Sequence, residues 1–149
     1  MTNPNKIVIE AANGTKPNPI INNLIVSGAT VYLAGVLGTD ASGQLVSGGV
    51  KAETIQSMRN ATERLSHVNL DLSDVVSITI FICDYGINLP NLNEVYGGCF
   101  PEGASMPVRT AVGVAALPLN AAAEFSIVGL SRLSRVNMLT WLKIAVKRP

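Results

Sequence analysis

Two charged side chains stand in an otherwise apolar stretch of the chain. Arg109 and Glu124 are the only charged residues between positions 106 and 128. Extended runs that alternate with a period of two lie on both sides of a turn around Pro118, and this pattern predicts a β-hairpin with the two charges nearly opposite each other. A guanidinium in apolar surroundings favours an anion, and its planar fork suits a carboxylate. Arg109 therefore either binds a carboxylate ligand or forms a structural salt bridge with Glu124.

The sequence around this pair resembles the C-terminal signature of the YjgF/RidA family, whose members are also called L-PSP or reactive intermediate deaminase proteins. The family pattern is roughly P-x-R-[ST]-x-V-x-V-x-x-LP-x(5)-E. It is matched at Pro107, Arg109, Thr110, Val112, Val114, Leu117, Pro118 and Glu124. Segments earlier in the chain agree in order with the family, so the resemblance covers roughly Lys6 to Val128.

The resemblance implies a homotrimer with a site in the cleft between subunits. The family hydrolyses enamines and imines, such as 2-aminoacrylate, to 2-oxo acids and ammonia. By resemblance, Arg109 would bind the substrate carboxylate, the backbone N–H of Ala111 would add a contact, and Glu124 would hold a water as general base. Gly35 would lie where the backbone approaches the ligand. Asn93 matches an asparagine of the family's second helix, although a packing role suits it equally. This scheme requires no metal and no organic cofactor.

Three positions depart from the family pattern. Ile21 stands where the deaminases usually carry a tyrosine, Ala34 replaces a serine, and Ala111 replaces a frequent cysteine. The pocket is then more apolar, which favours a larger or more hydrophobic imine than 2-aminoacrylate. Two alternatives stay open. One is a specialised pathway enzyme on the same scaffold, such as an aminomuconate-type deaminase, a hydrolase or a cyclase. The other is a non-catalytic trimer that binds small carboxylates.

Composition limits the partners of the chain. The 149 residues suit one domain, and a net charge of +1 gives no electrostatic basis for nucleic acid as the main ligand. Only 14% of the residues are charged, against about 25% in typical globular chains. With a mean hydropathy of +0.34, the chain has apolar surface to spare for a subunit interface. Cys83 and Cys99 stand apart, without the spacing of a metal site.

Targeting signals are not visible in the sequence. No stretch reaches the roughly 20 apolar residues that a membrane span needs. The first ten residues show neither a signal-peptide core nor the arginines of a transit peptide. We therefore expect a cytoplasmic protein.

Periodicity predicts an α+β fold. Strands are expected at Lys6–Ile9, Leu24–Val26, Thr30–Val36 and Val75–Cys83, before the final hairpin. The first helix is expected to begin at Val50 or Lys51, with a buried stripe of Ala52, Ile55, Met58 or Arg59, Ala61 or Thr62, Leu65 and Val68. The second is expected to begin at Asn88-Leu89-Pro90 and to weaken at Gly97-Gly98, with Leu92, Val95 and Cys99 facing inward. This order predicts a single-domain sandwich of one mixed sheet with two helices on one face, and the family's chorismate-mutase-like fold has the same layout.

The last segment departs from the family, whose members end soon after the final strand. We expect a YjgF/RidA-like domain over residues 1–129 and an atypical extension over residues 130–149, either a helix or a tail. The extension alternates basic residues with apolar ones such as Trp141 and Leu142. Such a segment can lie on a membrane or on a partner as a basic amphipathic helix. We favour the alternative that it is a helix packed on its own trimer or a poorly ordered tail.

Overall fold

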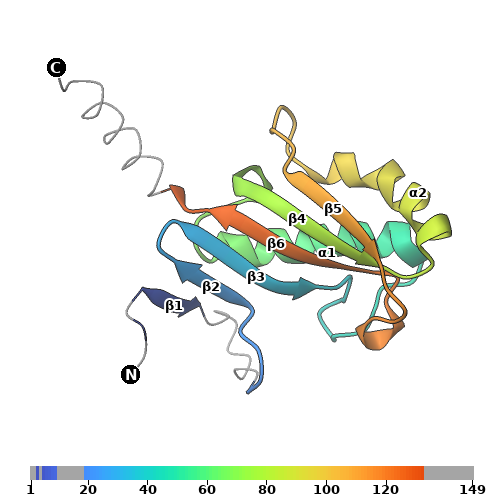
Figure 1. The fold of residues 1–149 in the computed structure, drawn as a ribbon, viewed down its shortest axis with the longest axis horizontal. Helices are drawn as coiled ribbons and strands as arrows, with labels where there is room; N and C mark the ends of the chain where they lie inside the picture. The colour runs from blue at the N-terminus through green and yellow to red at the C-terminus, as the bar shows by residue number, and fades with distance from the viewer. Residues whose placement is uncertain (1–2, 4, 10–18, 133–149) are drawn as a thin grey trace.

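A six-stranded mixed sheet with two helices on one face forms the structure, a computed structural model that describes residues 3, 5–9 and 19–132 (Figure 1). The strands are β1 (Lys6–Ile9), β2 (Leu24–Ser27), β3 (Thr30–Val36), β4 (Val75–Ile82), β5 (Val108–Gly113) and β6 (Ala123–Leu130). The helices are α1 (Gly49–Ser66) and α2 (Tyr85–Tyr96), with 3₁₀ turns at Leu72–Asp74, Gly97–Cys99 and Pro118–Asn120. The α+β architecture predicted from the sequence is confirmed.

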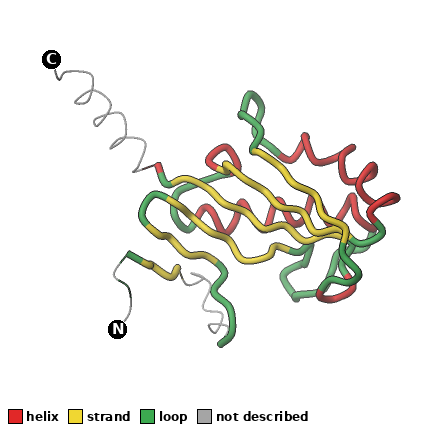
Figure 2. Tube along the Cα trace, in the orientation of Figure 1, coloured by secondary structure: helices red, strands yellow, loops and turns green. Residues whose placement is uncertain are grey.

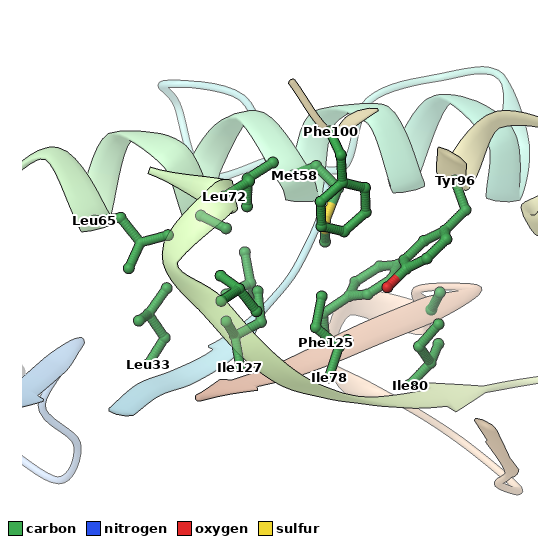
Figure 3. Packing of buried hydrophobic residues seen from close by; sticks show 14 of the residues in the cluster. Leu33, Met58, Leu65, Leu72, Ile78, Ile80, Tyr96, Phe100, Phe125 and Ile127 are labelled. Atoms are coloured by element: carbon green, nitrogen blue, oxygen red, sulfur yellow. The ribbon is translucent and has the colours of Figure 1, made fainter. Parts of the chain in front are cut away.

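The core lies between the sheet and the helices. Ile78, Ile80 and Ile82 of β4 alternate with partly exposed residues, and all three are fully buried. Figure 3 shows Ile78 and Ile80 with other buried residues from the sheet and both helices. Neither of the two described helices packs on the opposite face of the sheet (Figure 2). Apolar residues such as Tyr32, which is 47% exposed, remain on that face.

The predicted hairpin between the last two strands is wrong. In sheet order β1-β2-β3-β6-β4-β5, β4 separates β5 from β6. β4 pairs with β5 in parallel and with β6 antiparallel. The parallel pair needs a crossover connection, which α2 supplies. β4 therefore lies inside the sheet with a partner on each edge, and its helix-facing residues Ile78, Ile80 and Ile82 are buried.

Polar residues occupy much of the buried face of α1. Met58, Ala61 and Leu65 are buried as predicted, but Ile55 is 36% exposed. Glu53, Thr54 and Ser57 are buried instead. Thr54 donates to the Val50 carbonyl at 2.7 Å, and Glu53 Oε2 accepts a hydrogen bond of 2.7 Å from the backbone N–H of Ala122. These bonds satisfy polar groups at positions where an apolar pattern is normally expected.

The second helix begins earlier than predicted. It starts at Tyr85, so Asn88 lies one turn inside it rather than at its cap. The Asn88 side chain still closes this end, because its Nδ2 donates to the Cys83 carbonyl at 2.8 Å. Pro90 therefore lies inside the helix. The helix ends before Gly97-Gly98, as predicted.

The end of β6 is fixed by an arginine. Arg132 donates to Asp71 at 2.7 Å and to the buried Asp74 at 2.8 Å, which ties the end of the domain to the turn before β4. The proposed boundary at residue 129 stays a prediction, and residues 133–149 of the extension lie outside the described residues. Within the described part, neither helix is long and apolar enough to cross a bilayer.

Glu53→Ala is expected to lower the free energy of unfolding by about 1–3 kcal/mol, because it leaves the half-buried Ala122 N–H without its acceptor. Glu53→Gln keeps an acceptor oxygen and should cost less. Urea unfolding of the three proteins measures this difference. Equal stability of Glu53→Ala and the wild type would show that the bond does not hold the start of β6.

Candidate active site

Arg109 lies on the edge strand β5, on the face that α2 covers. Its parallel partner is Ile78, whose side chain is in the core, so the guanidinium leaves the sheet on the helix side. Nη1 of Arg109 donates to Oδ1 of Asn93 at 2.7 Å. The structure thus brings together Arg109 and Asn93, two of the residues predicted from the sequence, and Asn93 accepts a hydrogen bond from Arg109. Ala111 follows two residues later on the same face and is half-buried.

Tyr96 is a neighbour of Arg109 that the sequence analysis missed. The guanidinium carbon of Arg109 lies 4.9 Å from the centroid of the Tyr96 ring, within the range of a cation–π contact. Burial raises the pKa of Tyr96 to about 12, so the guanidinium faces a neutral ring at any ordinary pH. The spacing in the sequence could have indicated this contact. Tyr96 follows Asn93 by three residues, and residues three apart lie on the same side of a helix.

Glu124 lies on the other face of the sheet. Its β6 neighbours Ala123 and Phe125 point into the core, so the half-buried Glu124 points away from the helices. It is next to Gly35, because a Cβ built at Gly35 would collide with the Glu124 carboxylate. The pairing of β3 with β6 shifts register between Leu33 and Val36, which is typical of a β-bulge. Glycine at this position leaves room for the carboxylate.

Ala34 lies next to Gly35, and a hydrogen bond joins it to the segment that carries Ile21. Ala34 is part of the same bulge, and its N–H donates to the Asn23 carbonyl at 3.0 Å. Ile21 comes two residues before Asn23 in the segment leading to β2 and is 52% exposed. The structure thus places Gly35, Ala34 and Glu124 together, with the segment that carries Ile21 beside them.

The two groups of predicted residues do not meet within one chain. Arg109 leaves one face of the sheet and Glu124 the other, and β4 lies between their strands. Two strand spacings separate β5 from β6 by about 10 Å. None of the ion pairs among the described residues involves either side chain. The expectation that they lie nearly opposite each other is therefore wrong, and so is the alternative of a cross-strand salt bridge.

Metal-ligating side chains do not cluster in the part of the chain that the structure describes. The chemistry available to the two groups is therefore that of the residues named above: a guanidinium for an anion, and a carboxylate that can orient a water or accept a proton.

A family model described as Endoribonuclease L-PSP matches residues 16–130. The chain belongs to the L-PSP (YjgF/RidA) family. Among curated L-PSP relatives, the human 2-iminobutanoate/2-iminopropanoate deaminase is 37% identical over 102 residues, which are 68% of this chain and 72% of that protein. The family resemblance found in the sequence is confirmed.

Solved structures share the L-PSP fold. A Rid-family protein from Yersinia pestis, described as of unknown function, has a TM-score of 0.76 at 27% identity and covers 84% of this chain and 98% of its own. A structure of E. coli TdcF with bound serine has a TM-score of 0.69 at 25% identity, covering 76% of this chain and 91% of its own.

Gly35→Ala is expected to displace the Glu124 carboxylate and to lower kcat for the reaction proposed below by about 10²-fold, the cost of a small misplacement at a reacting group. The fold should be retained, because Gly35 does not have a positive φ and the group that must move is the end of a side chain. Steady-state kinetics and thermal unfolding measure both effects.

Gly86→Ala is the matched control, since a Cβ there meets open space. Unchanged kcat in Gly35→Ala would show that the position of the Glu124 carboxylate is not critical.

Proposed function

We propose that the protein hydrolyses enamine and imine intermediates, 2-imino acids above all, to 2-oxo acids and ammonia at a site between subunits of a homotrimer. One observation carries the proposal. The guanidinium that suits a substrate carboxylate and the carboxylate that suits a water are both present, but they lie on opposite faces of one sheet. They can act on one substrate only if two chains contribute to the site. The deaminase names of the curated relatives support the reaction.

Arg109 is the proposed carboxylate clamp. Nη1 is bonded to Asn93, and the other N–H groups of the guanidinium make no ion pair among the described residues. A fork with free donors can bind both oxygens of a carboxylate. A carboxylate ligand is consistent with the solved structure of E. coli TdcF, which contains bound serine, a small molecule that carries a carboxylate. The N–H of Ala111 is the proposed second donor.

Glu124 is the proposed general base. It would hold a water against the imine carbon of a substrate anchored by Arg109 of the neighbouring chain. The enamine first tautomerises to the imine. The water oxygen then bonds to the C=N carbon while Glu124 takes one water proton and returns it to the imine nitrogen, which gives a carbinolamine. Glu124 next takes the proton of the new hydroxyl and passes it to the amino nitrogen, so that the C–N bond breaks, ammonia leaves and the C=O group of the 2-oxo acid forms. A positioned base contributes about 10²–10⁴-fold, and the rest comes from holding the reactants together.

The open face of the sheet is the proposed subunit interface. Apolar side chains on it include Val112, which is 40% exposed, and Tyr32. Glu124 points to this face as well. Burying this surface in a trimer removes apolar area from water and closes the Glu124 side of the site.

The lining of the pocket favours substrates with apolar side chains. Ala34, Ala111 and Ile21 supply methyl groups where the family usually has a hydroxyl, a thiol and a phenol. We propose that imino acids larger than 2-iminopropanoate, such as those derived from leucine, are the preferred substrates.

Ammonia release from imino acids made in situ by an amino-acid oxidase tests the function. The wild type should accelerate hydrolysis over the spontaneous rate, increasingly from the alanine to the leucine derivative. Arg109→Ala should raise KM most because it removes the anchor, and Glu124→Ala should lower kcat by about 10²-fold or more because it removes the base.

Glu94→Ala is the control for these variants, because Glu94 is an exposed carboxylate paired with Lys51 on the outer surface of the helices. Spontaneous rates with every imino acid would contradict the deaminase function and favour a binding protein. Equal acceleration of small and large imino acids would contradict only the preference for apolar side chains.

A further inference from the structure

The position of Arg109 requires an explanation, because long side chains on exposed edge strands are normally mobile. Fixing such a side chain costs about 2 kcal/mol of rotamer entropy. No ion pair among the described residues holds the Arg109 guanidinium. Two side chains of α2 contact the guanidinium: Asn93 accepts its hydrogen bond at 2.7 Å, and the centroid of the Tyr96 ring lies 4.9 Å from its central carbon.

Tyr96 is itself held rigidly. Only 6% of the residue is exposed, and its ring packs against the edge of Phe100 at a centroid distance of 5.1 Å and an interplanar angle of 65°. Figure 3 shows Tyr96 reaching from α2 toward the sheet residues Phe125 and Ile80. A ring fixed in the core has little freedom left to lose when a cation rests on it.

The hydroxyl of Tyr96 takes no part in this contact. It is buried and has no hydrogen-bond partner among the described residues. A buried hydroxyl without a partner is unfavourable, so the hydroxyl adds nothing to the stability of the core. What Tyr96 offers Arg109 is the face of its ring.

We propose that Tyr96 is a positioning residue for substrate binding. Its ring supports the guanidinium of Arg109 from one side while Asn93 fixes one nitrogen, and the remaining donors are then aimed together at a carboxylate. The inference rests on the proposed role of Arg109. It goes beyond that role by assigning the affinity of the clamp to a core aromatic residue that touches no substrate.

Binding of 2-oxobutanoate, a stable analogue of the proposed products, tests the inference without requiring catalysis. Tyr96→Leu removes the ring face and should weaken binding about two- to thirty-fold, the range that cation–π contacts span. Tyr96→Phe keeps the face and should retain the affinity of the wild type. Rescue by phenylalanine separates support of Arg109 from any role of the hydroxyl. Calorimetry or an NMR titration measures the four proteins, with Arg109→Ala as the reference for loss of the clamp.

Leu92→Val is the matched control for lost packing, because Leu92 is a fully buried residue of the same helix. It should lower thermal stability without changing the affinity for 2-oxobutanoate. Wild-type affinity in Tyr96→Leu overturns the inference, and so does equal weakening in Leu92→Val.

Failure of the proposed reaction gives a different result. A wild type that binds 2-oxobutanoate through Arg109 and Tyr96 but releases no ammonia from imino acids contradicts the deaminase function and supports the role of Tyr96. A wild type that binds no 2-oxo acid overturns both.

Discussion

The pairing of β4 with β5 on one edge and with β6 on the other is the constraint on which the candidate site depends. β4 is paired on both edges, and Ile78, Ile80 and Ile82 on its helix-facing side are buried in the core. Its position separates Arg109 from Glu124 by two strand spacings, and the register directs the two side chains to opposite faces. A single sheet therefore presents one part of the proposed site on each face, and a symmetric oligomer such as the proposed trimer would bring unlike parts together.

The same pairing explains how Arg109 is oriented. A parallel β4–β5 pair requires a crossover, and the crossover here is α2. Because α2 connects the two strands, it packs over the face of β5 from which Arg109 emerges. Asn93 and Tyr96 then reach the guanidinium from one side of the helix. The same helix thus connects β4 to β5 and supplies the two side chains that contact the Arg109 guanidinium.

Contacts from α1 and β3 position Glu124, the second group of the proposed site. Glu53 crosses from α1 to accept the N–H of Ala122, two residues before Glu124. The β-bulge in β3 brings Gly35 against the Glu124 carboxylate. The first contact involves the backbone of Ala122, and the second involves a glycine, which has no side chain. The geometry of β3 and β6 therefore sets the position of the Glu124 carboxylate.

Sequence reasoning could name candidate residues for the site but not their arrangement in space. Arg109, Glu124 and Gly35 stand in local patterns with fixed spacing, and alternation along a strand shows which residues share its face. It does not show which strands are neighbours, and the hairpin was inferred from closeness in sequence although β4 lies between. Glu53 was missed because its acceptor role depends on Ala122, 69 residues away. Tyr96 was missed because an aromatic residue at the end of a helix is most simply a core residue.

Complementation between two impaired variants tests the central claim most directly. Arg109→Ala keeps Glu124, and Glu124→Ala keeps Arg109, so a site between the two chains has both groups intact. If the variants are unfolded together, refolded as a 1:1 mixture and assayed for ammonia release, random assembly should restore about a quarter of the wild-type activity. At a substrate concentration below the wild-type KM, each variant refolded alone should stay far below this level, because Arg109→Ala raises KM and Glu124→Ala lowers kcat. A mixture no more active than its two components would show that the groups do not act across subunits, and would contradict the account.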